Sequence, residues 1–500
     1  MLETRLVDSS LVNFLLAVIV YKVFRRVPEL SFSLSIIVFN LISFGCSGQS
    51  VLSSPLEREW IKYAFYSDTL HLLDPFAQPF SAREEIVLLK GIDERTDLNL
   101  GEVIARREQF LAEDKLNING WYSSDLAELW NVNAEISYRT SGLNLHYTLG
   151  SKYTNNQDTT FGLTYNKFLL PIRSRSRQAY MSYELTDITK VGFGRIPFNW
   201  SLIGNSGLII SENTWPKDGY FMSHKSSNLS FDFFTVRLDD VLSNDLRYPT
   251  SATILAKRYL SAHRILFVLN KQLKISLSEA VIFGGSDRAL MLQYINPVNV
   301  YFISKQSDRW GFEEEKANPV IGLDVLYTSN SGKSRVYLQM VIDDIDFVPE
   351  LTHVFPNRYA VQCQLSHRTN NSGSLVFSIK EVSDWMYTSF YSWGNFTNYH
   401  QFVGNSMNGV TEVNFEHQID INSYLISARC SFLSFKDQNS MEQFDFASST
   451  ERMNKRAKFC IAAQRATSHK LMLKSRLDVI NDFTLSEMQI SMSLGVGVVW

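Results

Sequence analysis

The sequence is poor in cysteine and proline and carries no strong charge of either sign. It has four cysteines among 500 residues, and Cys363, Cys430 and Cys460, which follow the N-terminal segment, show no CxxC spacing. This odd number without such spacing predicts neither a disulfide framework nor a zinc site, and we expect no cofactor and no metal. The formal net charge of -3 lacks the basic excess of a nucleic-acid binder, which argues against that class.

Motifs of the common enzyme classes are also missing. The sequence has no HExxH and no GxSxG motif. Ser331–Ser334 copies the end of a phosphate-binding loop, but Tyr327 stands where the first glycine is required. We therefore predict a protein that is not an enzyme, although a catalytic triad assembled from distant residues stays open.

Long hydrophobic runs are absent beyond residue 46, where none approaches the roughly 18 residues that a transmembrane helix needs. Any membrane crossing there must use strands. Two shorter apolar runs, at 11–23 and 30–44, precede Cys46–Gly48, small residues of the kind that a signal peptidase reads. We interpret 1–48 as a cleaved leader; an inner-membrane anchor and a lipoprotein at Cys46 are the alternatives.

In residues 49–114 the apolar residues recur with the spacing of amphipathic helices. Ser81–Glu84 forms a capping box, in which a serine and a glutamate three residues later can satisfy the first backbone groups of a helix. Residues 101–112 repeat the amphipathic pattern. Directly after a leader, these short helices predict a small periplasmic bundle.

From residue 115 to residue 500, apolar residues recur at every second position. In 488–500, large apolar residues alternate with small or polar ones, and the chain ends on Trp500. Alternation over about ten residues is typical of a membrane-spanning strand. We predict an all-β fold: a transmembrane antiparallel β-barrel of about 18 strands with an apolar outer face and a polar lumen. A soluble sheet, whose polar face meets bulk water, is the alternative.

Two internal stretches carry a family pattern. Gly194–Trp200 continues to Gly207–Ser211 as G-R…W…L-x-x-S, with Ser201 where a glycine is usual after the tryptophan. The second stretch contains, in order, Arg258–Arg264, Leu277–Gly284, Tyr294–Pro297, Gly322–Asp324 and Tyr337–Asp344. These segments resemble the capsule-assembly Wzi family. The resemblance implies a non-catalytic, lectin-like barrel of the cell outer membrane, with capsular or extracellular polysaccharide, outer-membrane lipid and the barrel-assembly machinery as partners.

The candidate polysaccharide-binding residues combine arginine forks, aromatic faces and polar groups. They are Arg195, Trp200, His263, Arg264, Glu279, Asn296 and Trp393. A guanidinium matches the geometry of an acidic group on a sugar, although a hydrogen-bonded His263–Arg264 pair without a ligand is the ordinary interpretation. Glu279 is in phase with apolar neighbours, so its carboxylate would face lipid, and we predict that a β-bulge or a strand end intervenes.

Charged residues near the predicted lumen leave two further questions open. An acidic cluster at Asp343, Asp344 and Asp346 predicts either a calcium site or, more often, a solvated turn. Five cations are predicted to face inward: Arg429, Lys458, Lys470, Lys474 and Arg476. They either pair with inward acids or form an electropositive wall for an acidic glycan. Capsule or exopolysaccharide assembly or attachment is the predicted function, and a general diffusion porin is the alternative.

Overall fold

The computed structural model describes residues 115–124, 130–140, 143–153, 172–203, 207–211, 216–243, 254–286, 290–307, 317–344, 357–369, 373–389, 392–398, 401–405, 407–421, 424–436, 453–468, 471–483 and 487–499. The predicted leader, the predicted helical bundle and Trp500 lie outside these residues. Across the part that is described, no helix is both long enough and apolar enough to cross a membrane.

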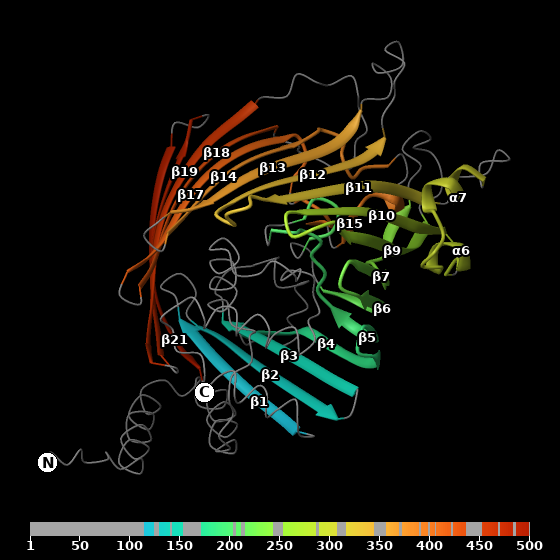
Figure 1. Cartoon of the computed structure of the whole chain (residues 1–500), viewed down its shortest axis with the longest axis horizontal. Helices are drawn as coiled ribbons and strands as arrows, with labels where there is room; N and C mark the ends of the chain where they lie inside the picture. Colours follow the sequence, from blue (N-terminus) through green and yellow to red (C-terminus); the bar gives the residue numbers. More distant parts are fainter. Residues whose placement is uncertain are drawn as a thin grey trace, which may run out of the picture. The chain divides into compact units, whose positions relative to one another are not determined.

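One antiparallel sheet of 19 strands accounts for most of this structure (Figure 1). Its strands are β1 Lys115–Ser124, β2 Trp130–Thr140, β3 Leu143–Tyr153, β4 Ile172–Thr186, β5 Thr189–Ile196, β6 Lys217–Lys225, β7 Leu229–Arg237, β8 Val241–Ser243, β9 Ile254–Val268, β10 Leu273–Ser286, β11 Ala317–Thr328, β12 Ser334–Asp344, β13 Arg358–Arg368, β14 Gly373–Val382, β17 Val410–Ile421, β18 Tyr424–Lys436, β19 Met453–Ser468, β20 Leu471–Asp482 and β21 Glu487–Val499. Since β8 has only three residues, the described residues form a wall of 18 longer strands, in agreement with the predicted number of about 18.

Neighbouring wall strands follow one another along the chain. The short β8 pairs with the first residues of β9, and β7 pairs with β9 directly. The first strand also meets the last, because Trp121–Ser124 of β1 pairs with residues of β21. A separate hairpin, β15 (Thr397–Asn398) with β16 (Gln401–Phe402), lies in the connection between β14 and β17.

The connections alternate between short and long. Short ones, such as 141–142 and 422–423, join the strands at one end, and long ones, such as 197–216 and 287–316, join them at the other. Outer-membrane barrels have short turns on the periplasmic side and long loops on the extracellular side. We orient the barrel accordingly.

The outer face carries exposed apolar side chains at every second position. On β12, Val336 and Leu338 are exposed, whereas Tyr337 and Gln339 between them are buried. Large exposed apolar residues on other strands include Phe377, Ile379, Phe415, Phe432, Phe459 and Ile461. Side chains alternate between the two faces of a strand, so this pattern confirms the predicted apolar exterior.

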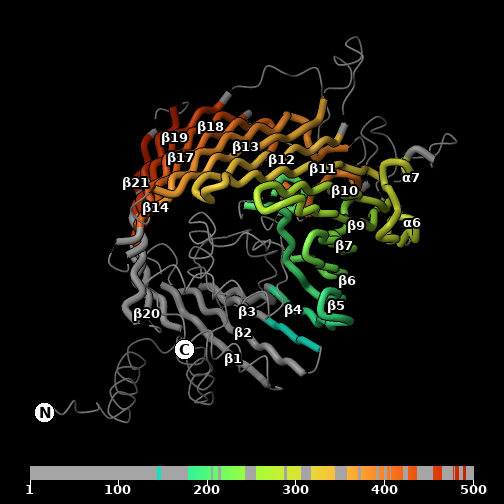
Figure 2. The backbone as a smooth tube through the Cα atoms, viewed as in Figure 1, coloured from blue at the N-terminus to red at the C-terminus, as the bar shows by residue number. Residues whose placement is uncertain are grey.

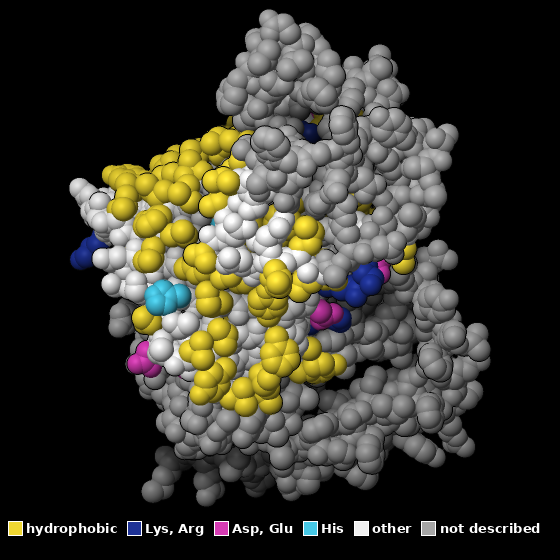
Figure 3. Space-filling view, turned by 90° about the vertical axis from the view of Figure 1, so that its right-hand side faces the viewer, with side chains coloured by type: hydrophobic (Ala, Val, Ile, Leu, Met, Phe, Trp, Pro, Cys, Tyr) yellow, Lys and Arg dark blue, Asp and Glu magenta, His cyan; other side chains and the backbone are white. Residues whose placement is uncertain are grey.

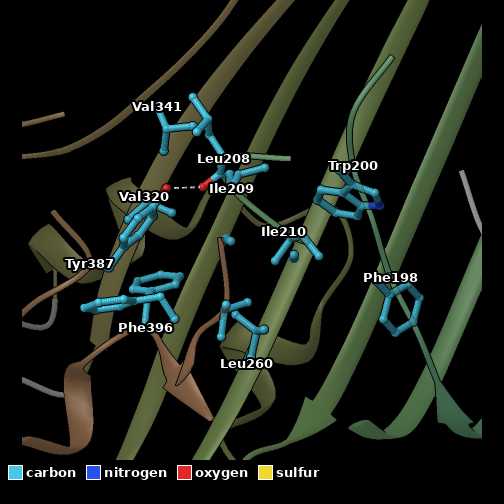
Figure 4. Close-up of a cluster of buried hydrophobic side chains, with 14 of the residues drawn as sticks. Phe198, Trp200, Leu208, Ile209, Ile210, Leu260, Val320, Val341, Tyr387 and Phe396 are labelled. Atoms are coloured by element: carbon cyan, nitrogen blue, oxygen red, sulfur yellow. Dashed lines mark hydrogen bonds between the residues drawn. The ribbon is translucent and has the colours of Figure 1, made fainter. Parts of the chain in front are cut away.

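From β7 to β14 the extracellular half of the inner face is largely apolar, which corrects the prediction of a polar lumen for this part of the wall. The described residues of two segments, 197–211 and 383–409, pack against the inward side chains of several strands, and we call them the plug. Its apolar members include Phe198, Trp200, Leu208, Ile209, Ile210, Tyr387, Phe396, Phe402 and Val403. They contact wall residues such as Leu260, Val320 and Val341 (Figure 4).

Helices cover part of the outer face. The connection between β10 and β11 contains α6 (Leu292–Ile295) and α7 (Tyr301–Ser307), which lie beside β9, β10 and β11 (Figure 2). A third, 3-10 helix, η3 (Ser392–Gly394), belongs to the plug. The same strands are thus covered by the plug on their inner side and by α6 and α7 on their outer side.

Candidate functional site

The plug is fixed to the wall by a buried glutamine. Gln339 on β12 accepts a hydrogen bond from the Leu208 backbone N–H at 2.8 Å and donates from Nε2 to the Trp200 carbonyl at 3.0 Å. Gln362 on β13 donates to the same Gln339 oxygen at 2.9 Å. Buried backbone groups need such partners, so this side chain fixes the position of Trp200 and Leu208 along the barrel axis.

Tyr387 joins the two plug segments. Its hydroxyl donates to the carbonyl of Leu208 (Figure 4). Its ring lies 5.7 Å from that of Phe402. Burial raises the pKa of the Tyr387 phenol, so the group stays a protonated donor. Its φ of 68° is unusual for a bulky residue, and the packing around it must hold this conformation. Gly404 is needed at the same junction, because a Cβ there would strike the Leu208 carbonyl.

Two buried arginines on the wall bind the second plug segment. Arg258, fully buried on β9, donates to the carbonyls of Asn395 at 3.1 Å and Thr397 at 3.0 Å, and pairs with the carboxylate of Asp239. Arg358 on β13 donates to the carbonyl of Thr388 at 2.7 Å. Each guanidinium supplies several donors in a fixed plane, which suits the capping of backbone carbonyls.

The structure brings two predicted site residues, Arg264 and Trp200, together inside the barrel. Arg264 Nη2 lies 2.9 Å from the Asp232 carboxylate, which also accepts a hydrogen bond from the Ser223 hydroxyl at 2.6 Å. The guanidinium lies 5.4 Å from the centre of the Trp200 ring. Because both side chains are buried, they hold the plug to β9 and leave little surface for a polymer.

Trp393 and Arg195 lie apart from that pair. Trp393 in η3 is buried against Ala256 at the extracellular end of β9. Arg195 on β5 shares the outer face with the exposed Phe193 and makes a two-point contact with Asp218, at 2.6 and 3.0 Å. Only Arg195 of these two presents an accessible side chain.

His263 and Glu279 meet on the outer face, under α7. Their side chains are 3.3 Å apart, and the Glu279 carboxylate accepts backbone hydrogen bonds from Tyr301 at 2.8 Å and Phe302 at 2.6 Å. The prediction of a bulge or strand end is wrong, because β10 keeps its register with both neighbours across this residue. The start of α7 satisfies the carboxylate instead. Asn296, exposed between α6 and α7, accepts a hydrogen bond from the Val298 backbone.

Among the described side chains of the remaining inner wall, from β14 to β20, three cross-strand ion pairs occur, which we call the charged wall. They are Lys380 with Glu412 at 2.5 Å, Arg429 with Glu416 at 2.6 Å, and Arg456 with Asp482 at 3.0 Å. In each pair the two residues are directly opposite in the strand register. The side chains of Arg429 and Arg456 are 51% and 42% exposed.

The charged wall shows how one of the cations predicted to face inward is paired. Arg429 pairs with an acid, as the ordinary interpretation expects, and the described wall alternates in sign rather than being uniformly positive. The side chains of Lys470, Lys474 and Arg476 lie outside the described ones. The sequence predicted pairing with inward acids as one alternative but did not identify those acids, because only the register of neighbouring strands shows which acid faces which base.

Metal ligation finds no support in the described part of the chain. No group of three or more His, Cys, Asp or Glu side chains there is placed to hold an ion. Asp343 of the predicted acidic cluster instead faces Arg358, with 3.9 Å between the charged atoms, and Asp346 lies outside the described residues.

A wall of 18 long antiparallel strands, apolar outside, with short turns at one end and long connections at the other, defines an outer-membrane β-barrel. No protein-family model matches the sequence, and no curated protein matches it.

Solved structures do match the fold. One is Wzi of Escherichia coli, described as an outer-membrane, carbohydrate-binding β-barrel involved in group 1 capsule assembly; it is 12% identical, with a TM-score of 0.56, covering 89% of this chain and 98% of that one. The Pseudomonas aeruginosa barrel OccK5 (OpdH) is 11% identical, with a TM-score of 0.45, covering 78% and 98%. OccK1 (OpdK) of the same organism is 8% identical, with a TM-score of 0.47, covering 77% and 97%.

Proposed function

We propose that the chain is a plugged outer-membrane barrel of the Wzi type, which holds capsular or extracellular polysaccharide at the cell surface and catalyses no reaction. The motifs from Gly194 to Asp344 and the similarity of the fold to a carbohydrate-binding barrel support this proposal. The similarity covers 89% of this chain and 98% of the other.

The observation that carries the proposal is the plug. A diffusion porin needs a polar, water-filled lumen. Here the extracellular half of the inner face, from β7 to β14, is packed with apolar side chains of two loops that buried hydrogen bonds fix in place. Such a barrel is suited to presenting a surface rather than to passing solutes.

The charged wall is the best candidate for contact with the glycan. Arg429 and Arg456 keep accessible guanidinium groups, while Glu412, Glu416 and Asp482 keep carboxylates beside them. Carboxylates accept hydrogen bonds from sugar hydroxyl groups, and guanidinium groups bind acidic substituents. Arg195 is a further accessible contact near the extracellular end, whereas Trp200, Arg264 and Trp393 serve the plug.

A gene deletion complemented with variants tests the proposal. Cells that lack the protein should lose surface-attached polysaccharide, and the wild-type gene should restore it. The double variant Arg429→Gln/Arg456→Gln should restore the barrel but not the full glycan coat. Arg237→Gln is the matched control, because Arg237 is 52% exposed and paired with Asp240 outside the charged wall. An unchanged coat in the deletion strain would refute the proposal.

A diffusion porin is the second candidate, because the charged wall leaves polar, accessible side chains on the inner face of β14 to β20. Conductance separates the two functions. A porin gives a large steady current and has no effect on the glycan coat when deleted.

A further inference from the structure

The connection between β10 and β11 carries an apolar surface on the outside of the barrel. Six of its large apolar side chains are exposed: Leu290, Leu292, Val298, Val300, Phe302 and Ile303. Leu292 is 79% exposed and Val298 is 82% exposed. Within 290–307 the only charged residue is Lys305. An extracellular loop in water would not be expected to gather apolar residues so densely.

This segment lies against the side of the barrel and not above its rim. Glu279, on which α7 begins, is near the middle of β10. Near the middle of β6, the Tyr220 hydroxyl lies 3.4 Å from the carbonyl of Ile295, to which it donates. The inner side of the segment packs Tyr294 and Tyr301 onto Val281 and Phe283, all fully buried. The segment is therefore beside the strands, at the level of their middle and extracellular parts.

The exposed surface of the segment continues the outer surface of the wall. Ile321, directly opposite Glu279 on β11, is 40% exposed, and Leu277 on β10 is 50% exposed. Figure 3 looks onto this side and shows hydrophobic side chains over much of the described surface. The surface around the segment is the one that an outer-membrane barrel turns to lipid.

We propose that residues 290–307 are embedded in the outer leaflet of the membrane, where their exposed side chains bind lipid acyl chains. This proposal rests on the fold and is independent of the polysaccharide function. Acyl chains fit the observations because the surface is apolar, has one cation, and adjoins lipid-facing strands. The connection thus widens the hydrophobic outer surface of the barrel instead of reaching into the medium.

Glu279 is the positioning residue for this segment. A backbone without water must find partners within the protein, and the carboxylate accepts the first two N–H groups of α7. His263 lies on the other side of the carboxylate, so the acid is enclosed by the segment and the wall. The polar contact fixes where the segment rests, and the tyrosine rings close the surface over it.

Site-specific fluorescence in lipid vesicles tests the location. In a full-length background with all four cysteines changed to alanine, single cysteines at Leu292, Val298 and Ile303 would carry an environment-sensitive dye. Asn330, exposed in a short turn, is the water-facing control, and Phe377, exposed on β14, is the lipid-facing control. Because the bilayer core excludes water and ions, iodide quenching at the three segment positions should be at least about fivefold weaker than at Asn330. Spin-labelled lipid should quench the three positions as strongly as Phe377.

Two results would overturn the proposal. Iodide quenching equal to that at Asn330, in a barrel that still shows the folded mobility on gels, would place the segment in water. Protection from iodide without quenching by spin-labelled lipid, together with cross-linking between copies at these cysteines, would assign the surface to a second copy of the chain.

Replacement of Glu279 tests its positioning role separately. Glu279→Leu puts an apolar side chain on a lipid-facing strand, so we expect the barrel to fold while iodide quenching at Val298 and Ile303 rises at least about threefold, since the N–H groups of α7 lose their acceptor. Glu279→Gln keeps an acceptor and should preserve most of the protection. Glu381→Leu is the matched control, because Glu381 is an exposed acid that also faces outward, on β14. Unchanged quenching in Glu279→Leu would remove the positioning role.

Discussion

Ion pairs on two sides of the barrel have nearly equal lengths but very different surroundings. Arg264 and Asp232, under the plug, are 2.9 Å apart, and Arg456 and Asp482, on the charged wall, are 3.0 Å apart. The Arg264 side chain is 1% exposed, whereas that of Arg456 is 42% exposed. The two acids are similarly enclosed, at 14% for Asp232 and 11% for Asp482, so the pairs differ in whether water solvates the arginine. Burial therefore separates structural arginines from arginines available to a ligand.

The largest decrease in the free energy of unfolding is expected for Arg258→Ala. It leaves the Asp239 carboxylate and the plug carbonyls of Asn395 and Thr397 without their donor. Removing one partner of a buried pair costs about 3 to 5 kcal/mol. Urea titration of the refolded barrel, followed by its heat-dependent gel mobility, measures the change. A loss as small as that of Arg456→Ala would contradict the account of the plug.

Arg264→Ala gives the most direct comparison between a buried and an accessible arginine, because the Arg264–Asp232 and Arg456–Asp482 ion pairs are nearly equal in length. We expect a loss of about 3 kcal/mol, since Asp232 is left buried without its cation. The amount of folded barrel in the outer membrane should fall together with polysaccharide attachment. Attachment that falls while the amount of barrel stays constant would instead make Arg264 a binding residue.

Tyr387→Phe tests the junction between the plug segments with a smaller change. The ring is kept, but the Leu208 carbonyl loses its donor. An unpaired buried group costs about 1 to 3 kcal/mol. Comparison with Tyr359→Phe, which removes an exposed hydroxyl bonded to Glu381 at 2.9 Å, isolates the effect of burial. Equal losses in the two variants would argue that the junction contributes nothing.

The smallest effect on stability is expected on the charged wall. Arg456→Gln or Arg429→Gln should change the free energy of unfolding by about 1 kcal/mol or less, because pairs whose guanidinium group stays in water contribute little and the glutamine still donates to the acid. Binding of purified acidic polysaccharide should weaken in both variants. In the wild type it should weaken with salt, which screens charges over about 8 Å at physiological ionic strength. Binding that is insensitive to both changes would remove the wall from the proposed site.

The sequence predicted the strands and their faces because side chains alternate along a strand. Val336 and Leu338 lie outward and Gln339 inward, as the period of two requires. The alternation gives no information on which way side chains face where both faces of a strand are buried. Ala280 to Phe283 is a continuous apolar run because Ala280 and Ile282 contact the plug while Val281 and Phe283 contact α6 and α7.

The candidate site was predictable only in part. The sequence marked Glu279 as an outward carboxylate, but its partners are on a connection 22 residues away in sequence that no local pattern positions. The pairing of Trp200 with Arg264 depends in the same way on where a loop enters the barrel. The acids of the charged wall become visible only when the register places Glu416 opposite Arg429.

The single-channel conductance of the full-length barrel in a planar bilayer tests the central claim most directly. The plug predicts no large steady current for the wild type. Gly404→Trp, which inserts a large side chain where the two plug segments touch, should raise the frequency of open events if the barrel remains folded. Gly373→Trp, at a glycine in the short turn region of β14, is the control and should stay closed. A large steady open current from the wild-type protein would contradict the claim that the lumen is plugged.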